Sequence, residues 1–141
     1  MWNWQEDLIL NIDAQRDQAR KFLENFNRAD PRVFEEAVTD DFTFEIVSSM
    51  KEFPPLRGRR EFIEREVATL RRLFPQGLNL ILETVICEGP HVAALARCDT
   101  IAHNGKRYQQ RYHFYLRFEG ELIAEAREYN DTDLIRRVFL D

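Results

Sequence analysis

The chain has 141 residues, a formal net charge of −5 at pH 7 and a hydrophobic fraction of 44%. This length predicts one domain, residues 1–141, with a hydrophobic core of its own. The acidic balance argues against a nucleic-acid binder, because such proteins carry a basic surface. No apolar run is long enough to span a membrane, and the N-terminus lacks the segments of a signal peptide, so we predict a cytoplasmic protein that binds no membrane.

The side chains that most often bind metals are few and scattered in this sequence. Two cysteines, Cys87 and Cys98, form no CxxC motif, and the three histidines are dispersed along the second half of the chain. We therefore expect neither a metal site nor a cofactor.

The first half of the chain predicts three helices and one strand. Apolar residues at helical spacing indicate a long first helix that Asn3 can cap. Asp30 and Pro31 are typical of the cap and the first residue of a second, short helix. Alternating residues at 42–47 predict a strand, and an apolar stripe at 59–74 predicts the third helix.

The second half predicts four consecutive strands and a short C-terminal helix. The strands are expected at residues 78–88, 91–103, 107–118 and 121–130, and the helix at 132–139. The breaks between strands are short, and Asn104-Gly105 is a strong hairpin signal, so consecutive strands should be antiparallel neighbours. This order predicts an α+β fold, in which a curved antiparallel sheet wraps around the N-terminal helices and encloses a pocket.

Five residues on two of these strands are expected to line the pocket. Tyr108, Tyr112 and Phe114 share the more apolar face of their strand, since residues two apart point the same way. Phe44 and Ile46 share a face of the first strand in the same manner. These side chains can serve as core packing or as ligand contacts, and the two tyrosine hydroxyls are available to a polar ligand group.

The strand at 91–103 is apolar on both faces, and such strands are usually covered on both sides. We expect Arg97 and Asp99 to point inward and the small residues Ala94 and Ala96 to lie on the outer face. A second subunit would cover this outer face. The sequence therefore predicts a homodimer that forms through the sheet.

Three ionisable residues are thus expected on otherwise apolar inner faces. Glu128 shares a face of the last strand with Ala124 and Ala126, and it joins Arg97 and Asp99 there. Burying a charge is costly unless the charge is paired. The three residues are therefore expected to form either a structural ion-pair cluster or a functional site.

The order of the elements and several short motifs resemble the SnoaL-like branch of the nuclear transport factor 2-like (NTF2-like) superfamily. The motifs are Asp40-Asp41, Leu56-Arg57-Gly58-Arg59, Asn104-Gly105-Lys106-Arg107-Tyr108, Phe118-Glu119-Gly120-Glu121-Leu122-Ile123 and Arg127-Glu128-Tyr129-Asn130-Asp131. The superfamily includes polyketide cyclases, ketosteroid isomerase and limonene epoxide hydrolase. The resemblance spans nearly the whole chain and implies a cone-like α+β roll, also called cystatin-like, with an internal pocket, commonly in a homodimer. It does not imply one reaction, because this scaffold carries several activities.

Limonene epoxide hydrolase carries an Arg-x-Asp motif on one strand and a second Asp on its last strand. Arg97-Cys98-Asp99 is similar to that motif, and Glu128 stands in place of the second Asp. Phe44 and Ile46 replace the Tyr and Asn that position water in that enzyme, so the resemblance does not imply epoxide hydrolysis. The groups that act in ketosteroid isomerase are missing as well.

The leading hypothesis is a small-molecule enzyme that uses general acid–base catalysis on a lipophilic substrate in an apolar pocket. Glu128 would act as the base and Asp99 as the acid, and Arg97 would organise their charges, because carboxylates near one guanidinium can differ in pKa. Isomerisation, dehydration, cyclisation and hydrolysis all fit this arrangement. The alternatives are a non-catalytic pocket that binds a small ligand and a protein-interaction domain that works through the sheet.

Overall fold

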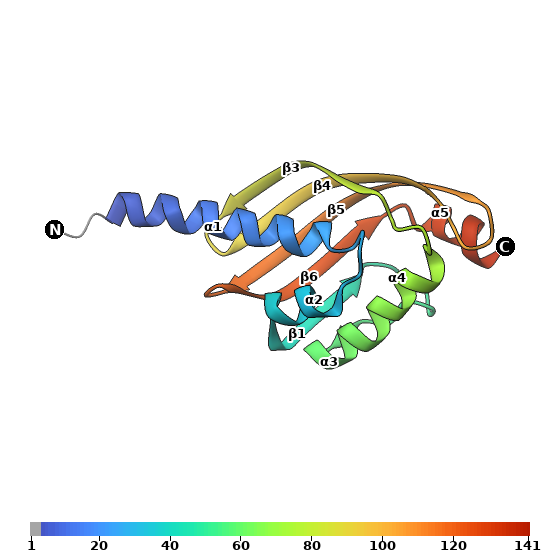
Figure 1. The fold of residues 1–141 in the computed structure, drawn as a ribbon, viewed down its shortest axis with the longest axis horizontal. Coiled ribbons are helices and arrows are strands. Elements are labelled where there is room, and N and C mark those ends of the chain that lie inside the picture. The colour runs from blue at the N-terminus through green and yellow to red at the C-terminus, as the bar shows by residue number, and fades with distance from the viewer. Residues whose placement is uncertain (1–3) are drawn as a thin grey trace.

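The computed structural model describes the backbone of residues 4–141 and the side chains from residue 11 onward. A six-stranded sheet in the order β2-β1-β6-β5-β4-β3 forms its centre (Figure 1). The strands are β1 (Val38–Ile46), β2 (Leu56–Arg57), β3 (Leu80–Glu88), β4 (His91–Ile101), β5 (Arg107–Glu119) and β6 (Leu122–Asn130). Consecutive strands from β3 to β6 are antiparallel neighbours, which confirms the prediction from their short connections.

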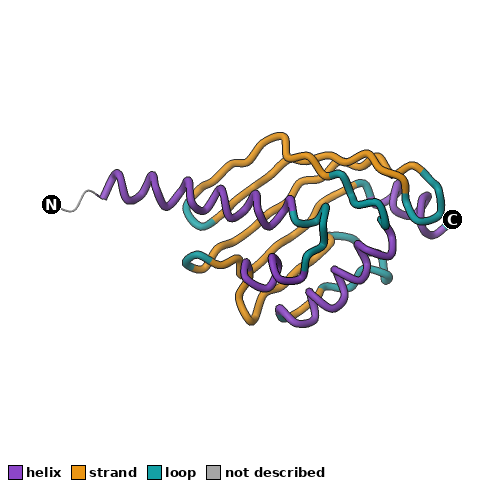
Figure 2. Tube along the Cα trace, in the orientation of Figure 1, coloured by secondary structure: helices purple, strands orange, loops and turns teal. Residues whose placement is uncertain are grey.

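The helices cover one face of the sheet, as Figures 1 and 2 show. They are α1 (Trp4–Glu24), α2 (Pro31–Ala37), α3 (Arg59–Phe62), the π-helical turn η1 (Ile63–Val67), α4 (Ala68–Leu73), α5 (Thr132–Ile135) and the π-helical turn η2 (Arg136–Leu140). Asp30 caps α2 by accepting a hydrogen bond from the Arg32 N–H at 3.0 Å, as predicted. Asn3, the expected cap of the first helix, lies outside the described residues. None of the described helices has both the length and the apolar composition needed to cross a membrane.

One strand pair makes the sheet mixed rather than wholly antiparallel. β1 runs parallel to β6, and Ile46 lies beside Glu128 in their register. The Val47 N–H donates to the Glu128 carbonyl oxygen at 2.9 Å, which fixes the two strand ends to each other. Because most of the chain separates these strands, the sequence contains no turn that would reveal their relative direction.

Aromatic rings fill the space between the helices and the sheet. Phe22 of α1 meets Phe34 of α2 at 5.5 Å between ring centroids, and Phe42 of β1 meets Phe62 of α3 at 4.9 Å. Phe114 of β5 extends this aromatic core across the sheet. Buried rings of this size supply much of the stabilisation of a small domain, so the aromatic core holds helices and strands in fixed positions.

The face of β4 that packs against the core is not the one that the sequence predicted. Ala94 and Ala96 are buried, whereas Arg97 and Asp99 lie on the exposed outer face, so the expectation that the charged residues point inward is wrong. The reason is the register with β5, in which Ala94 pairs with Phe114. Paired residues point to the same side of a sheet, so small residues of β4 must accompany the large inward rings of β5.

Candidate functional site

Two glutamates are buried among the described residues. Glu66 in η1 and Glu128 in β6 are each 7% exposed. Carboxyl groups are almost never buried without a structural or functional reason, because leaving water disfavours their charged form. These two residues are therefore the starting point of the site.

Glu66 is buried because of its position in the helical segment formed by α3, η1 and α4. It lies four residues after Phe62 and four before Leu70, both of which are buried, and a helix places residues at this spacing on one face. The π-helical turn that contains Glu66 is a rare local geometry that is frequent at functional sites. Glu66 was absent from the site predicted from the sequence, although a carboxyl within the apolar stripe at 59–74 was a detectable signal.

Glu128 is held at the inner face of the sheet near the end of β6. The Asn130 Nδ2 amide donates a hydrogen bond to Glu128 Oε2 at 2.7 Å. The end of β6 is itself fixed by Gln110, whose side-chain amide donates to the Asp131 carbonyl oxygen and accepts from the Asp131 N–H, both at 3.0 Å. The inward direction of Glu128 that the sequence indicated is therefore correct, and hydrogen bonds hold the strand end that carries it.

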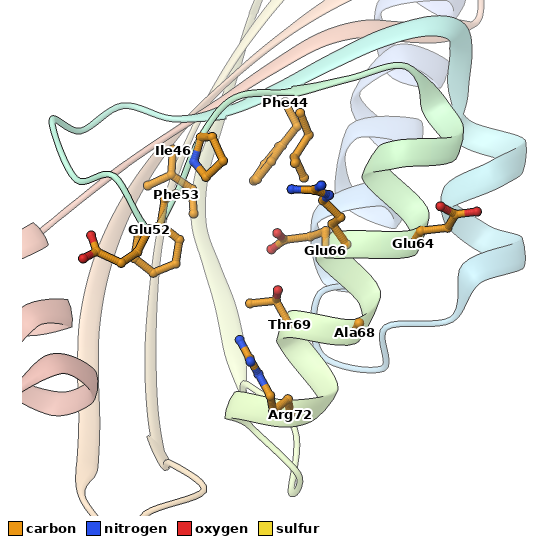
Figure 3. Close-up of a pocket in the computed structure, with 12 residues that line it drawn as sticks. Phe44, Ile46, Glu52, Phe53, Glu64, Glu66, Ala68, Thr69 and Arg72 are labelled. Carbon is orange, nitrogen blue, oxygen red and sulfur yellow. The ribbon is translucent and has the colours of Figure 1, made fainter.

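Two adjoining chambers lie between the helical segment and the sheet. The outer chamber has a volume of about 420 Å³ and is lined by Phe44, Ile46, Glu52, Phe53, Pro54, Leu56, Glu64, Arg65, Glu66, Ala68, Thr69 and Arg72 (Figure 3). The inner chamber has a volume of about 40 Å³, and both Glu66 and Glu128 line it. Ile46, Phe53, Glu66 and Thr69 line both chambers. The outer chamber is large enough for a small organic molecule, and the inner one for a water molecule or a small group.

The pKa of both buried carboxyls is raised. Desolvation raises the pKa of Glu66 to about 7. The pKa of Glu128 rises to about 8, mainly through desolvation and further through the negative charge of Glu66, while the Asn130 hydrogen bond opposes the rise. Near neutral pH the pair therefore holds about one proton, so that one carboxyl can accept a proton while the other can donate one.

A cluster of buried hydroxyl and thiol groups lies beside Glu128. The Tyr108 and Tyr112 hydroxyl oxygens are 3.2 Å apart, and both residues line the inner chamber. The Cys98 thiol donates to the Tyr112 hydroxyl at 3.8 Å. Burial raises the pKa of both tyrosines above the usual value, and the charge of Glu128 adds to it, so the hydroxyls stay neutral and able to donate hydrogen bonds.

The residues expected to contact a ligand fall into three places. Phe44 and Ile46 line the outer chamber, and Tyr108 and Tyr112 line the inner one. Phe114 lies in the aromatic core, where its ring stacks on Tyr112 at 5.2 Å between centroids. Four of the five residues therefore border the chambers, and the fifth supports one of their walls.

The structure does not bring Arg97 and Asp99 to Glu128. Arg97 forms an ion pair with Glu83 of β3 at 3.4 Å, and Asp99 forms one with Arg107 of β5 at 2.6 Å, all on the outer face of the sheet. The Arg107 guanidinium lowers the pKa of Asp99 and keeps this carboxylate charged. These charges are satisfied at the surface, and Glu66 rather than Asp99 is the carboxyl that lies near Glu128.

No cluster of three or more metal-binding side chains occurs within the part of the chain that the structure describes. The buried acidic groups of the site are Glu66 and Glu128, and Glu52 and Glu64 also line the outer chamber. The other polar side chains that line the two chambers carry hydroxyls and guanidinium ions. What this arrangement can do with its own side chains is transfer protons and form hydrogen bonds.

The fold defines an α+β protein in which helices pack on one face of a six-stranded sheet and leave a cavity between the two layers. The chain belongs to the SnoaL-like domain family, whose model matches residues 19–126. No curated protein is matched by the sequence. The family membership confirms the resemblance that the motifs indicated.

Solved structures with the same fold cover nearly the whole chain at low sequence identity. An NTF2-like protein of unknown function from Burkholderia pseudomallei K96243 superposes with a TM-score of 0.79 at 20% identity, over 91% of this chain and 98% of that one. An LEH-like epoxide hydrolase from M. tuberculosis gives 0.74 at 19% identity, over 90% of each chain. A protein with a ketosteroid isomerase-like fold from Catenulispora acidiphila DSM 44928 was solved in complex with trimethylamine. It superposes with a TM-score of 0.73 at 13% identity, over 86% of this chain and 90% of that one. These comparisons establish an NTF2-like fold.

Proposed function

We propose that this protein is a small-molecule enzyme that transfers protons by general acid–base catalysis on a lipophilic substrate. The observation that carries the proposal is the pair of buried carboxyls, Glu66 and Glu128, which border one cavity and have raised pKa values near neutrality. A catalytic acid or base works best when its pKa lies near the working pH. The chemistry needs no group beyond these side chains.

The two carboxyls have different roles in this proposal. Glu66 is the base, because it borders the larger chamber and has the lower pKa, so it is ionised first as the pH rises. Glu128 retains the proton of the pair and donates it from the inner chamber, directly or through a water molecule. Phe44, Ile46 and Phe53 hold the apolar body of the substrate and exclude water.

The reaction types consistent with this arrangement are isomerisation, dehydration, cyclisation and hydrolysis. All four require a proton to leave one reacting atom, of the substrate or, in hydrolysis, of water, and a proton to reach another. The solved relatives include an epoxide hydrolase, which supports a proton-transfer function on this fold by analogy.

The raised pKa values can be tested without knowledge of the substrate. In a protein labelled with carbon-13 at the glutamate carboxyls, NMR titration should show two signals that titrate well above the usual range. Glu66→Gln should remove one of them and lower the pKa of Glu128, because the neighbouring negative charge is lost. If both carboxyls titrate near 4.5 as exposed glutamates do, the acid–base proposal fails.

A second part of the proposal concerns assembly. The outer face of the sheet exposes large apolar side chains, including Ile86 at 59%, Leu95 at 47% and Tyr129 at 40%. Thr84, Leu95, His113 and Tyr129 follow one another across four strands in the registers of the sheet. Exposed apolar patches of this kind are typical of protein interfaces. We propose that two copies pair through this face, with different residues from those that the sequence indicated.

A further inference from the structure

The helical segment presents three polar groups of different chemistry to the outer chamber. Glu66, Thr69 and Arg72 point from one side of this segment toward the cavity, whereas Glu64 points away, as Figure 3 shows. The spacing of three residues keeps them on one helical face. A ligand in the chamber therefore meets a carboxyl, a hydroxyl and a guanidinium in succession.

Arg72 differs from Arg65 and Glu64, two charged residues of the same helical segment that also line the chamber. Arg65 is paired with Glu61 at 3.7 Å, and Glu64 is paired with Arg60 at 3.0 Å. Among the side chains of residues 11–141, none forms an ion pair with Arg72. A guanidinium presents a planar set of donors that matches a carboxylate or sulfonate.

The geometry points to Arg72 as the residue that selects an anionic, otherwise lipophilic ligand, and this inference rests on the function proposed for the same cavity. The anionic end of the ligand binds Arg72 at the opening, and its apolar body packs on Phe44, Ile46 and Phe53. The other end reaches Glu66. Arg72 follows Glu66 by six positions, which corresponds to a rise of about 9 Å along the helix axis between the two residues.

The charge of Glu66 is compatible with this binding mode. Near neutral pH the buried pair carries only part of its possible negative charge, so it repels an anion less than two ionised carboxylates would. Glu52 is the acidic side chain at the opening that opposes an anion, and it extends away from the helical segment (Figure 3). Glu52→Gln is therefore expected to tighten the binding of an anion.

Two fluorescent probes with the same aromatic body can test the role of Arg72. 1-Anilinonaphthalene-8-sulfonate carries a sulfonate, and N-phenyl-1-naphthylamine lacks it. Titrations at pH 6, where both glutamates are mainly protonated, isolate the contribution of the anion. Arg72→Gln should weaken binding of the sulfonate probe about tenfold, which is the loss of one charge-assisted contact, and change binding of the neutral probe less than twofold.

Matched variants control for overall charge and for the location of the probe. Arg71→Gln removes the same charge from the neighbouring exposed residue, which borders a different hollow, and should leave both affinities unchanged. Thr69→Phe fills the cavity and should weaken both probes. Equal effects of Arg71→Gln and Arg72→Gln on sulfonate binding would overturn the inference. Sulfonate binding that survives Thr69→Phe in a folded variant would also overturn it, because the probe would then bind outside the cavity.

This experiment separates the inference from the proposed function. In the Glu66→Gln variant, Arg72→Gln should still weaken binding of the sulfonate probe more than binding of the neutral probe, because the glutamine keeps the shape of the cavity. If the two glutamates have ordinary pKa values but sulfonate binding depends on Arg72, the acid–base proposal fails and the protein is an anion-selective binding pocket. Raised pKa values without any dependence on Arg72 would overturn only the inference.

Discussion

Glu66 and Glu128 come from different layers of the molecule and border the same small chamber. Glu66 lies on the helical segment, Glu128 lies on the sheet, and the negative charge of Glu66 contributes to the raised pKa of Glu128. Two carboxyls that are buried this close cannot both ionise readily, so the protein holds a proton between them.

Glu66→Gln should abolish proton transfer without disturbing the fold. A lipophilic ketone such as 2-tetralone, whose α-protons exchange slowly in deuterated water, provides an assay by NMR. We expect the wild-type protein to accelerate this exchange, and Glu66→Gln to lower the acceleration by about 100-fold or more, as loss of a general base does. Glu36→Gln is the matched control, because Glu36 is exposed on α2, borders neither chamber and should keep the wild-type rate. Equal rates for the two variants would exclude Glu66 as the base.

The stability of the protein should fall as the pH rises from about 4.5 to about 8. In this window an unfolded chain releases the protons of Glu66 and Glu128, whose usual pKa is 4.5, while the folded protein retains them until about 7 and about 8. The folded state binds more protons than the unfolded state, so the free energy of unfolding decreases with pH.

The double variant Glu66→Gln/Glu128→Gln lacks this contribution and should show a flatter profile. Urea unfolding at pH 5 and pH 8 measures the difference, which is expected to be about 2–5 kcal/mol larger in the wild type. Identical pH profiles for the two proteins would show that the carboxyls are not perturbed.

Asn130→Ala should raise the pKa of Glu128 further. The Asn130 amide donates to Glu128 Oε2 at 2.7 Å and favours the charged form of this carboxyl. Without the donor, the pKa of Glu128 lies further above the pKa of Glu66. The pH above which activity is lost should therefore rise. The carbon-13 titration of Glu128 measures the shift, and a pKa that stays the same or falls would contradict the role of this hydrogen bond.

Asp99→Asn should leave the exchange rate within about twofold of the wild type. Asp99 lies on the outer face, where its carboxylate is paired with Arg107, and it does not border the chambers. A loss of activity comparable to that of Glu66→Gln, in a folded variant, would restore Asp99 to the catalytic group that the sequence suggested.

Leu95→Glu should convert a dimer into a monomer. Leu95 is exposed in the middle of the outer face, and a carboxylate at this position would be buried without a partner in each subunit. Light scattering at micromolar concentration measures the mass, and Glu88→Gln, on the edge strand β3, is a suitable control. A wild-type protein that is already monomeric would contradict pairing through this face.

Periodicity and turn residues were sufficient to predict most of the fold. Pro and Asn-Gly residues marked the breaks between elements, and alternating residues identified the consecutive strands β3 to β6. Asp30 with Pro31 located the start of α2. These signals are local, because caps, tight turns and alternating faces depend on neighbouring residues. The parallel pairing of β1 with β6 has no local signal, since those strands are far apart in the sequence and no tight turn connects them.

The composition of the candidate site required the tertiary structure. The sequence alone determined that Glu128 lies on an apolar face of its strand. The choice between the two apolar faces of β4 depended on the pairing of Ala94 with Phe114, and this pairing carried Arg97 and Asp99 to the surface. Glu66 is 62 positions before Glu128 in the sequence (128 minus 66). Only the packing of the helical segment against the sheet could place these two carboxyls together and remove them from water, which is what raises their pKa values.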